Sequence, residues 1–520
     1  MSNNLYDVLL PAAPERDASV VLTTETDAAW TRGDIAVLAG RIAALLRNSG
    51  VEPGDRVAVQ VEKSPEAVCL YLACLKAGFV YVPLNTAYTD AELAHFLGDA
   101  EPKAFVGGSE AVPAPLAASH TETFTLGPDG RGSLIERARA LAPLEGTVPR
   151  ATDDLAALLY TSGTTGRAKG AMITHGNLIF TAKALEDAWE IDDADVLLHA
   201  LPIFHAHGLF IALNTALLAG AAMHFLPKFT IDAVVDRLPR STLFMGVPTF
   251  YARMVADARV DEALCKSVRL FVSGSAPLSV PAFEAFRART GHDILERYAM
   301  TETIVITTNP LHGHRVPGTV GSALPGVTVR VIDEAGRERP RGEIGEIALQ
   351  GPNVFAGYWR LPEVTAAEFT ADGSFKTGDL GKMEADGRLT IVGRNKDLII
   401  TGGYNVYPGE VEAVLARLDG VADCAVIGLP HADFGEGVVA VIERRPGDES
   451  LTQAGVVEAL SRELARYKLP KAVVLMDSLP RNALGKIQKN ELRRTHAALL
   501  QGGSGLPASS RPSSLSEKPV

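Results

Sequence analysis

Apolar and polar positions alternate with two different periods from about residue 57 onward. Short runs of β-branched and aliphatic residues predict buried strands, and longer stretches with helical apolar spacing predict helices. Gly78 is expected to end the first helix, because glycine readily adopts the left-handed conformation that follows a helix. Strands that alternate with helices indicate an α/β fold with a parallel sheet. The strands are expected at 57–61, 80–84, 241–247 and 268–274, and the helices at 66–78, 90–100 and 281–291.

The pattern changes in the second half of the chain. Between about 317 and 393, segments such as VTVRVIDEAGRERP combine strand-forming residues with turn residues, which predicts a β-rich part. From about residue 395, a second, α+β unit is expected. Residues 501–520 contain six Ser, three Gly and three Pro, which predicts a disordered tail. In the second unit, the helices are expected at 410–418 and 456–470, and the strands at 423–430, 438–445 and 472–480.

The longest apolar region runs from Val196 to Pro227 and contains LFIALNTALLAGAAMHFL. This segment approaches the length of a membrane span, but Asn214 and His224 interrupt it, so a buried helix is expected instead. The first residues, MSNNLYDVLLPAAPERD, lack the basic start and sustained apolar stretch of a secretion signal. We therefore expect a cytoplasmic protein without membrane insertion.

Composition excludes several classes of protein. The 520 residues include 50 Lys plus Arg and 62 Asp plus Glu, a formal net charge of −12 without long blocks of either sign, so a basic face for nucleic acid is not expected. Hydrophobic residues make up 47%, which is typical of a globular chain with a large core. Four cysteines lack the spacing of a disulfide framework or a zinc site and are expected to be buried in a reducing compartment: Cys69, Cys74, Cys265 and Cys424.

The segment YTSGTTGRAKG, Tyr160–Gly170, concentrates threonine, serine, glycine and one lysine. Hydroxyl groups, backbone amides and an ammonium group are suited to the oxygens of a polyphosphate. The spacing G-x-x-x-x-G-K-[ST] of a Walker A loop is not present. By composition alone, a plain surface loop explains the segment equally well.

Six further motifs follow this segment, and together they resemble the adenylate-forming superfamily, which includes acyl-CoA synthetases, luciferases and peptide-synthetase adenylation domains. The resemblance covers nearly the whole chain except the tail. It implies a large domain over 1–394 with two α/β subdomains, a β-rich subdomain and the ATP and acyl site, and a small mobile α+β domain over 395–500. The motifs are LPIFHAHG at 201–208, SGSAPL at 273–278, YAMTE at 298–302, TGD at 377–379, GRNKDLIITGGYNVYP at 393–408 and RNALGK at 481–486.

The resemblance implies roles in the activation of a carboxylic acid by ATP. Lys486 would supply positive charge where the carboxylate meets the α-phosphate, because the two anions repel each other. Glu302 and Thr165 would hold Mg²⁺, and Thr301 would bind phosphate. Without the motif, Thr301 and Glu302 would more often cap a helix. The other nucleotide-binding residues that the resemblance implies are Thr161, Ser162, Gly163, Thr164, Lys169, Ser275, Ala276, Tyr298, Asp379 and Arg394.

A second step transfers the acyl group to CoA, and in this superfamily the small domain turns between the two steps. Lys396 lies at the hinge position, and Gly402 and Gly403 would permit close approach of CoA. Outside their motifs, Asp379 would be a turn residue after glycine and Lys486 a solvated surface lysine.

Arg297 directly precedes YAMTE, where the chain enters the acyl site. A guanidinium binds a planar carboxylate through two parallel hydrogen bonds, whereas a pocket for fatty or aromatic acids would bury its charge without a partner. Arg297 therefore favours a substrate with a second carboxylate, unless it pairs with Glu296 or a nearby surface acid. His205 and His207 have an H-x-H spacing without an apparent third ligand, so His205 is expected to line the acyl pocket rather than bind a metal.

Longer stretches, including MGVPTFY, RVPGTVGSALPGV and GPNVFAGYWR, are similar to malonyl-CoA synthetases. In that group, the arginine before the Tyr-x-Met-Thr-Glu motif binds the distal carboxylate, and Ser275 is placed to assist it. Ala299 stands where glycine is usual, and its methyl group would crowd the nucleotide or trim the acyl pocket.

The resemblance thus implies a malonate:CoA ligase that uses ATP, Mg²⁺ and coenzyme A and forms malonyl-CoA, AMP and pyrophosphate, with methylmalonate as a second substrate. A short- or medium-chain monocarboxylate–CoA ligase is the alternative within the superfamily. A module that acylates a carrier protein and an adenylate-binding protein without turnover are alternatives from other functional classes. We expect small-molecule substrates, no nucleic acid, a monomer or homodimer, and a lysine acyltransferase that modifies Lys486.

Overall fold

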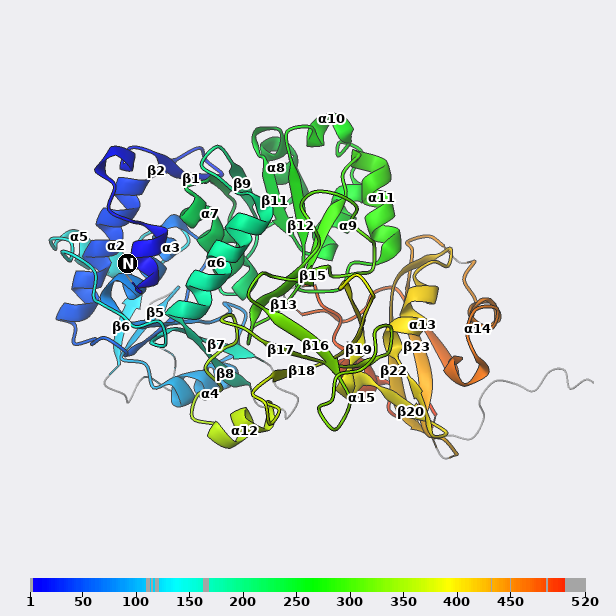
Figure 1. Ribbon diagram of the computed structural model, residues 1–520. Coiled ribbons are helices and arrows are strands. Elements are labelled where there is room, and N and C mark those ends of the chain that lie inside the picture. Colours follow the sequence, from blue (N-terminus) through cyan, green and yellow to red (C-terminus); the bar gives the residue numbers. More distant parts are fainter. Residues whose placement is uncertain are drawn as a thin grey trace, which may run out of the picture. The chain divides into compact units, whose positions relative to one another are not determined.

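The computed structural model describes residues 3–108, 113, 116, 121–161, 168–431, 433–448, 450–482 and 485–500. The chain divides into two compact units (Figure 1). The first comprises Met1–Thr377 and Gly381–Thr390, and the second comprises Gly378–Leu380 and Ile391–Val520.

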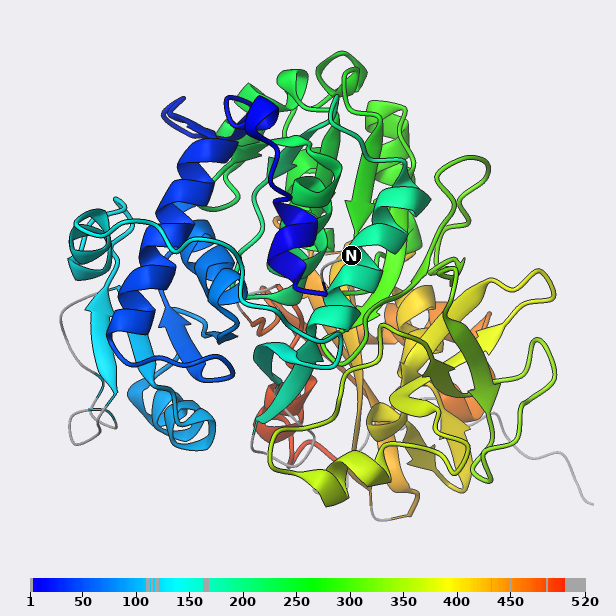
Figure 2. The ribbon, with the colours of Figure 1, turned by 60° about the vertical axis from the view of Figure 1, so that its left-hand side comes forward.

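A six-stranded sheet lies near the N-terminus, in the order β6-β5-β3-β4-β7-β8. Its strands are parallel except for the antiparallel pair β7 and β8, which contain the first and last residues of the YTSGTTGRAKG segment. Helices α2 and α3 pack against each other beside it (Figure 2). The strands are β3 (Arg56–Gln60), β4 (Val80–Pro83), β5 (Ala104–Gly107), β6 (Glu122–Thr125), β7 (Leu155–Thr161) and β8 (Lys169–Thr174).

A nine-stranded sheet forms the centre of the first unit, in the order β15-β14-β13-β12-β11-β9-β10-β1-β2. The consecutive neighbours from β13 to β1 are parallel, so their carboxyl ends share one edge of the sheet. The strands are β1 (Val20–Thr24), β2 (Ala29–Thr31), β9 (Val196–His199), β10 (Ala222–Phe225), β11 (Leu243–Gly246), β12 (Leu270–Ser273), β13 (Ile294–Met300), β14 (Ile304–Thr308) and β15 (Ser322–Ala323).

Helices of the first unit connect and cover these strands (Figure 1). Beside β11 and β12, the edge-to-face rings of Tyr251, Phe271 and Phe286 form the centre of a buried apolar cluster. The helices are α1 (Leu5–Leu9), η1 (Pro14–Arg16), α2 (Arg32–Asn48), α3 (Pro65–Ala77), α4 (Asp90–Ala100), α5 (Ser133–Arg139), α6 (His175–Trp189), η3 (His207–Leu213), α7 (Asn214–Ala219), α8 (Ile231–Arg237), η4 (Leu238–Arg240), α9 (Pro248–Ala256), α10 (Glu262–Cys265), α11 (Val280–Thr290) and α12 (Pro362–Ala367).

A four-stranded sheet, β16-β17-β18-β19, occupies the part expected to be β-rich. The second unit has a five-stranded sheet in the order β21-β20-β23-β22, with β24 paired to β23. Its core is rich in valine and isoleucine from β22 and β23. The elements are β16 (Thr328–Ile332), β17 (Gly345–Gln350), β18 (Phe375–Met383), β19 (Leu389–Arg394), η5 (Asn395–Asp397), β20 (Ile399–Thr401), β21 (Tyr404–Val406), α13 (Pro408–Leu415), β22 (Val421–His431), β23 (Gly435–Arg444), α14 (Gln453–Ser461), η6 (Arg466–Lys468), β24 (Ala472–Met476) and α15 (Lys489–Thr495).

These elements confirm the predicted α/β class and most of the predicted helices and strands. Gly78 ends α3 with a φ of 74°, as expected from the sequence. Two long helices were wrongly predicted. The segment 209–226 is a π-helical turn and α7, after which Gly220, in the left-handed conformation, ends the helix and β10 begins. Helix α14 stops at Ser461, whose hydroxyl donates to the carbonyl of Glu458 at 2.7 Å and so competes with the helical pattern.

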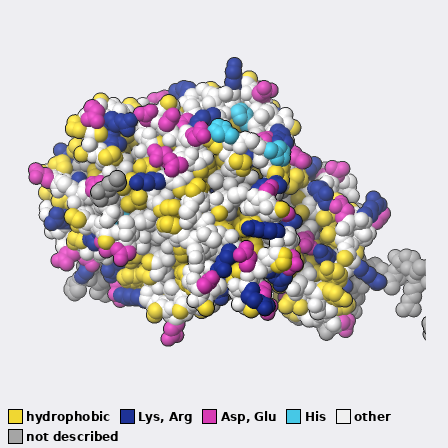
Figure 3. All heavy atoms as spheres, in the orientation of Figure 1, with side chains coloured by type: hydrophobic (Ala, Val, Ile, Leu, Met, Phe, Trp, Pro, Cys, Tyr) yellow, Lys and Arg dark blue, Asp and Glu magenta, His cyan; other side chains and the backbone are white. Residues whose placement is uncertain are grey.

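The four cysteines are buried and unpaired, as the sequence predicts. No helix among the described residues is long and apolar enough to cross a membrane. On the face shown in Figure 3, acidic and basic side chains are interspersed. The net negative charge is therefore not gathered into one patch on that face.

Candidate active site

Three sequence motifs meet at the carboxyl edge of the nine-stranded sheet. The segment LPIFHAHG follows β9, SGSAPL begins in the last residue of β12, and YAMTE begins in β13. Because β9, β11, β12 and β13 are consecutive parallel neighbours, the ends of these strands lie side by side. Open parallel sheets bind their ligands at this edge, so the topology supports a ligand site there.

Arg297 is the buried cation of this edge. It lies in β13 with only 3% of its surface exposed, and its Nε and Nη2 have no hydrogen-bond partner in the described part of the chain. A Cβ atom at Gly274 would lie 2.4 Å from its Cζ, so the guanidinium packs directly on the glycine backbone of SGSAPL. Burial lowers the pKa of Arg297 to about 9, which leaves it charged at neutral pH. A buried charge without a partner is costly, so this position favours an anionic ligand.

Glu296 does not pair with Arg297, because adjacent residues of a strand point to opposite faces. Its Oε1 accepts a hydrogen bond from the backbone amide of Leu278 at 2.9 Å. Burial raises the pKa of Glu296 to about 8. The alternative in which Arg297 forms an ion pair with Glu296 is therefore wrong.

The raised pKa of Glu296 predicts a pH-dependent loss of stability. The folded state keeps a proton that the unfolded state releases above pH 4.5, so this contribution is fully present below pH 4.5 and is lost as pH rises to about 8. Glu296→Gln keeps the acceptor for Leu278 and removes the titration. We expect the free energy of unfolding of this variant to exceed that of the parent by a margin that grows by about 1 kcal/mol per pH unit between pH 5 and 8.

Thermal unfolding of both proteins across this pH range measures the effect. Glu284→Gln, at an exposed position of α11, is the control and is expected to follow the parent. A margin that does not change with pH would show that Glu296 is ionised in the folded protein at neutral pH.

His207 contacts Ser275, whereas the sequence pointed to His205 as the pocket residue. Its Nδ1 is 3.1 Å from the hydroxyl of Ser275, and the side chain is almost fully buried. Burial and the charge of Arg297 lower the pKa of His207, which keeps the imidazole neutral. The half-buried His205 accepts from the amide of His207 at 3.2 Å. The H-x-H spacing marked both histidines as candidates, but only the fold shows that His207, and not His205, contacts Ser275.

Ser275 is held in an unusual backbone conformation. Its φ is 71°, in the left-handed region that non-glycine residues seldom adopt. Residues strained in this way often occur at ligand sites, where the surrounding structure enforces them. Ala276, the next residue, is half-buried. No group of three potential metal ligands occurs among the described residues, so the H-x-H pair has no third ligand there.

Glu302 lies in the tight connection between β13 and β14, and not at the start of a helix. It is buried, and its Oε1 accepts from the hydroxyl of Tyr358 at 2.9 Å. Ile304 ends this connection with a φ of 53°, a strained value for a β-branched residue. Thr301 is half-buried beside Glu302. The connection thus holds a carboxylate and a hydroxyl group side by side, and helix capping does not explain them.

Lys169 reaches the same region from β8. In the β7–β8 pair, Thr161 stands opposite Lys169. The Nζ of Lys169 lies 4.1 Å from the ring centroid of Tyr358 and 3.5 Å from Glu368 Oε1. Tyr358 therefore links Lys169 to Glu302, a role that the sequence did not indicate. The predicted phosphate-binding residues Ser162, Gly163, Thr164 and Thr165 lie outside the described residues.

Tyr298 and Ala299 are at an irregularity of the β13–β14 pair, where the register shifts between them. Tyr298 is 7% exposed, and its hydroxyl donates to the sulfur of Met300 at 3.5 Å. Ala299, which replaces the usual glycine, is half-buried. The extra residue is Ile306 of β14, whereas the residues of β13 from Arg297 to Met300 are paired one by one.

The second unit holds the remaining candidates. Asp379 in β18 is buried and accepts from Arg394 Nε of β19 at 2.9 Å, so these two predicted nucleotide-binding residues are in contact. Lys396 lies in η5, on the exposed side of the segment after β19. Gly402 and Gly403 form the exposed turn between β20 and β21, with φ values of 57° and 81°. Glycine is favoured at both positions, because this two-residue turn needs positive φ at both.

Lys486 follows a turn that Gly485 makes with a φ of 77°. The amide of Lys486 donates to Asn482 Oδ1 at 3.0 Å, and Arg481 and Ile487 form an antiparallel bridge across the turn. The side chain is exposed, although desolvation and the charge of Arg394 lower its pKa to about 8. Water screens charges at exposed groups, which weakens this effect. Lys486 is therefore positively charged at neutral pH.

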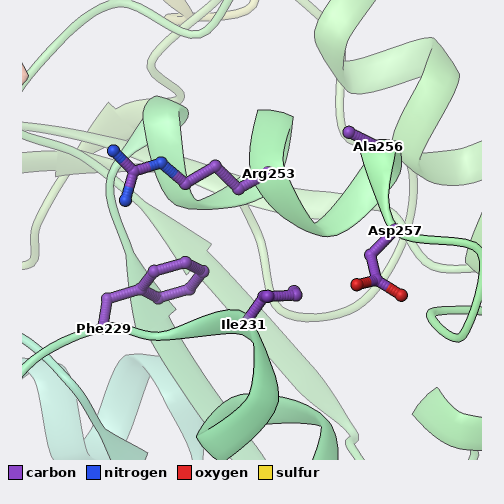
Figure 4. Close-up of a pocket in the computed structure, with 5 residues that line it drawn as sticks. All are labelled: Phe229, Ile231, Arg253, Ala256 and Asp257. Atoms are coloured by element: carbon purple, nitrogen blue, oxygen red, sulfur yellow. The ribbon is translucent and has the colours of Figure 1, made fainter.

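A separate hollow of ≈ 340 Å³ lies between the segment before α8 and helix α9 (Figure 4). Arg253 extends over the ring of Phe229, with its guanidinium carbon 6.0 Å from the ring centroid. The carboxylate of Asp257 on the other side is held by Arg259. The lining contains none of the candidate residues: Phe229, Ile231, Arg253, Ala256 and Asp257.

Comparison with known proteins identifies the family. Residues 11–359 match the AMP-binding enzyme family, and residues 410–486 match the AMP-binding enzyme C-terminal domain. The chain therefore belongs to the family of AMP-binding enzymes. This agrees with the adenylate-forming resemblance of its motifs.

Three relatives illustrate the range of similarity. ATP-bound MatB from Rhodopseudomonas palustris is 49% identical, with a TM-score of 0.94 over 96% of this chain and 100% of that one. A malonate–CoA ligase of Arabidopsis thaliana is 36% identical over 85% of this chain and 78% of the relative. An indoleacetate–CoA ligase of Aromatoleum aromaticum is 35% identical over 92% and 94%, respectively. Relatives with different acids are thus almost equally similar in sequence.

Proposed function

We propose that this AMP-binding enzyme is an AMP-forming acyl-CoA ligase that activates malonate, with methylmalonate as a second substrate. The observation that carries the choice of acid is the buried guanidinium of Arg297, two of whose nitrogens have no hydrogen-bond partner among the described residues. A dicarboxylate would supply the missing acceptors, with one carboxylate at Arg297 and the other free to react. The similarity to the Arabidopsis malonate–CoA ligase and to MatB supports the same choice.

The first reaction joins the acid to AMP. A carboxylate oxygen of malonate attacks the α-phosphorus of ATP, a P–O bond forms, and the bond to pyrophosphate breaks. We assign Lys486 to the position where the two anions meet, and Arg297, Ser275 and His207 to the distal carboxylate. A protonated lysine lowers the repulsion between the reacting anions, and a fixed distal carboxylate orients the reacting one.

Residues of several motifs would hold the nucleotide. Tyr298 and Ala276 are assigned to the base, Asp379 and Arg394 to the ribose, and Lys169 to the phosphates. Mg²⁺ neutralises phosphate charge when it is bound, and the buried oxygen ligand Glu302, oriented by Tyr358, fits a hard cation that takes most of its ligands from water and phosphate. Thr301, and Thr165 outside the described residues, would complete this side of the site.

In the second reaction, the CoA sulfur attacks the acyl carbon and forms a C–S bond. The bond between the acyl carbon and the phosphate oxygen breaks, and AMP leaves. The thiol proton is released. We propose that Lys396 is the hinge of the small domain and that the Gly402–Gly403 turn admits CoA, because its exposed glycines leave room for the pantetheine chain.

Acid-dependent AMP formation tests the choice of acid. With ATP, Mg²⁺ and CoA present, malonate, methylmalonate, succinate, acetate and butyrate are compared at equal concentration. We expect malonate or methylmalonate to be used at least tenfold faster than the monocarboxylates, about 1.4 kcal/mol in transition-state selection. If butyrate leads, the enzyme is a monocarboxylate–CoA ligase and Arg297 does not bind the acid.

A further inference from the structure

Lys63 is a buried lysine of the first unit that forms no ion pair with the described residues. It lies after the carboxyl end of β3 and directly before Ser64, the N-cap of α3, and is 8% exposed. Its ammonium is 2.8 Å from His199 Nδ1, 2.8 Å from the carbonyl oxygen of His199, and 4.2 Å from the ring centroid of Phe225. The ring nitrogen of His199, its carbonyl oxygen and the face of Phe225 thus interact with the three N–H groups of the ammonium.

These contacts determine which nitrogen of His199 carries the proton. The Nε2 of His199 lies 2.9 Å from the carbonyl oxygen of Gly208, which can only accept, so Nε2 must donate. The Nδ1 of the neutral ring is then an acceptor, and the ammonium of Lys63 is its donor. Burial and the charge of Lys63 both lower the pKa of His199, consistent with a neutral ring.

The hydrogen bond between His199 and Gly208 joins the two ends of the segment 199–208. A Cβ atom at Gly208 would lie 2.1 Å from the carbonyl oxygen of Pro202, so the two ends of the segment pack backbone to backbone. The segment carries His207, whose ring is 3.1 Å from Ser275 at the edge where Arg297 is buried. A change in the orientation of His199 would therefore alter its hydrogen bond to Gly208 and shift the adjacent His207, which contacts Ser275.

We propose that Lys63 is a positioning residue for the acid substrate: it fixes the ring of His199, which holds Gly208 and so places His207 beside Ser275 and Arg297. Lys63 itself contacts none of the residues assigned to the acid. The inference deepens the proposed function, because it concerns the site assigned to the distal carboxylate.

The test compares Lys63→Met with Lys76→Met. Lys76 is equally buried at 9%, lies 4.7 Å from the ring centroid of Tyr6, and stands in the last turn of α3, about 18 Å along the helix from Lys63. Both variants lose a buried ammonium over an aromatic ring. The quantities measured are KM and kcat for malonate and for ATP, and the thermal midpoint.

We expect Lys63→Met to raise KM for malonate about tenfold or more, with KM for ATP changed less than twofold. Lys63→Arg, which retains a cationic donor, should recover part of the loss. Lys76→Met should leave both KM values unchanged, whatever its thermal midpoint. An equal rise of both KM values in Lys63→Met, or the same malonate defect in Lys76→Met, would reduce Lys63 to a structural role and overturn the inference.

A double variant makes the test independent of general destabilisation. If Lys63 acts through His199, then Lys63→Met adds no further rise in KM for malonate once His199→Gln is present. Additive losses would contradict the proposed path. If Lys63→Met does not fold, His199→Gln alone must show the malonate-specific defect, and its absence would be equally decisive.

Failure of the proposed function has a different signature. If the parent enzyme prefers another acid in the panel, malonate is not the substrate, and the same KM comparison is made with the preferred acid. A selective rise for that acid in Lys63→Met would retain the positioning role. An unselective rise would reject it.

Discussion

Arg297→Ala is expected to lower kcat/KM for malonate about a thousandfold, roughly 4 kcal/mol, which is the scale of breaking a buried charge pair. The bound distal carboxylate would lose the guanidinium and remain buried without a counter-charge. Butyrate, which has no second carboxylate, should lose little. Initial rates of AMP formation over a range of malonate and butyrate concentrations measure both parameters.

Arg297→Lys is the matched control, because it retains the charge but not the two parallel donors of a guanidinium. We expect an intermediate loss. Equal losses for malonate and butyrate in Arg297→Ala would mean that Arg297 supports the fold of the edge rather than the acid.

Lys486→Gln is expected to slow the adenylation step by two to three orders of magnitude, about 3 to 4 kcal/mol, because it removes the charge between the two reacting anions. Malonate-dependent exchange of pyrophosphate into ATP measures this step alone. Thioester formation from separately prepared malonyl-adenylate should change much less, because the charge is needed only when the two anions meet.

Lys489→Gln is the control for this variant. Lys489 is three residues further along the chain but is bound to Glu412 at 2.7 Å. Its adenylation rate should stay close to that of the parent. If both half-reactions fall equally in Lys486→Gln, the lysine supports the small domain rather than the first reaction.

The same charge argument extends to modification. Acylation of the exposed Lys486 by a lysine acyltransferase would neutralise it, as glutamine does, and adenylation should slow by a similar factor. The proposal is supported by the exposure of the side chain on a turn, which leaves the ammonium accessible. Finding Lys486 unmodified by mass spectrometry in cells under every growth condition would remove its basis.

The order of elements and the family follow from the sequence alone. Alternating apolar periods reflect burial on one or both faces of each element, and this is a local property that residues 57–100 already display. Gly78 ends α3 because its backbone freedom is intrinsic. Motifs such as YAMTE are also local, so their presence needs no knowledge of the fold.

Local patterns did not determine where apolar stretches change from helix to strand. The segment 209–226 is apolar throughout, and hydropathy alone cannot distinguish a buried helix from a buried strand. The gap between β9 and β1 in the nine-stranded sheet is filled by β10, which ends the helix at Gly220. The partner strands that decide this lie far away in the sequence.

Tertiary structure alone decided the contacts of the residues proposed to bind the acid. Whether Arg297 pairs with Glu296 depends on which faces of β13 they occupy and on what packs there, and the fold turns the carboxylate to Leu278 and the guanidinium to Gly274. His207 rather than His205 meets Ser275 for the same reason. The contact of Lys63 with His199 joins residues 136 positions apart. Partners of buried polar groups are set by distant segments that folding brings together, so the sequence named the candidates and the fold assigned their contacts.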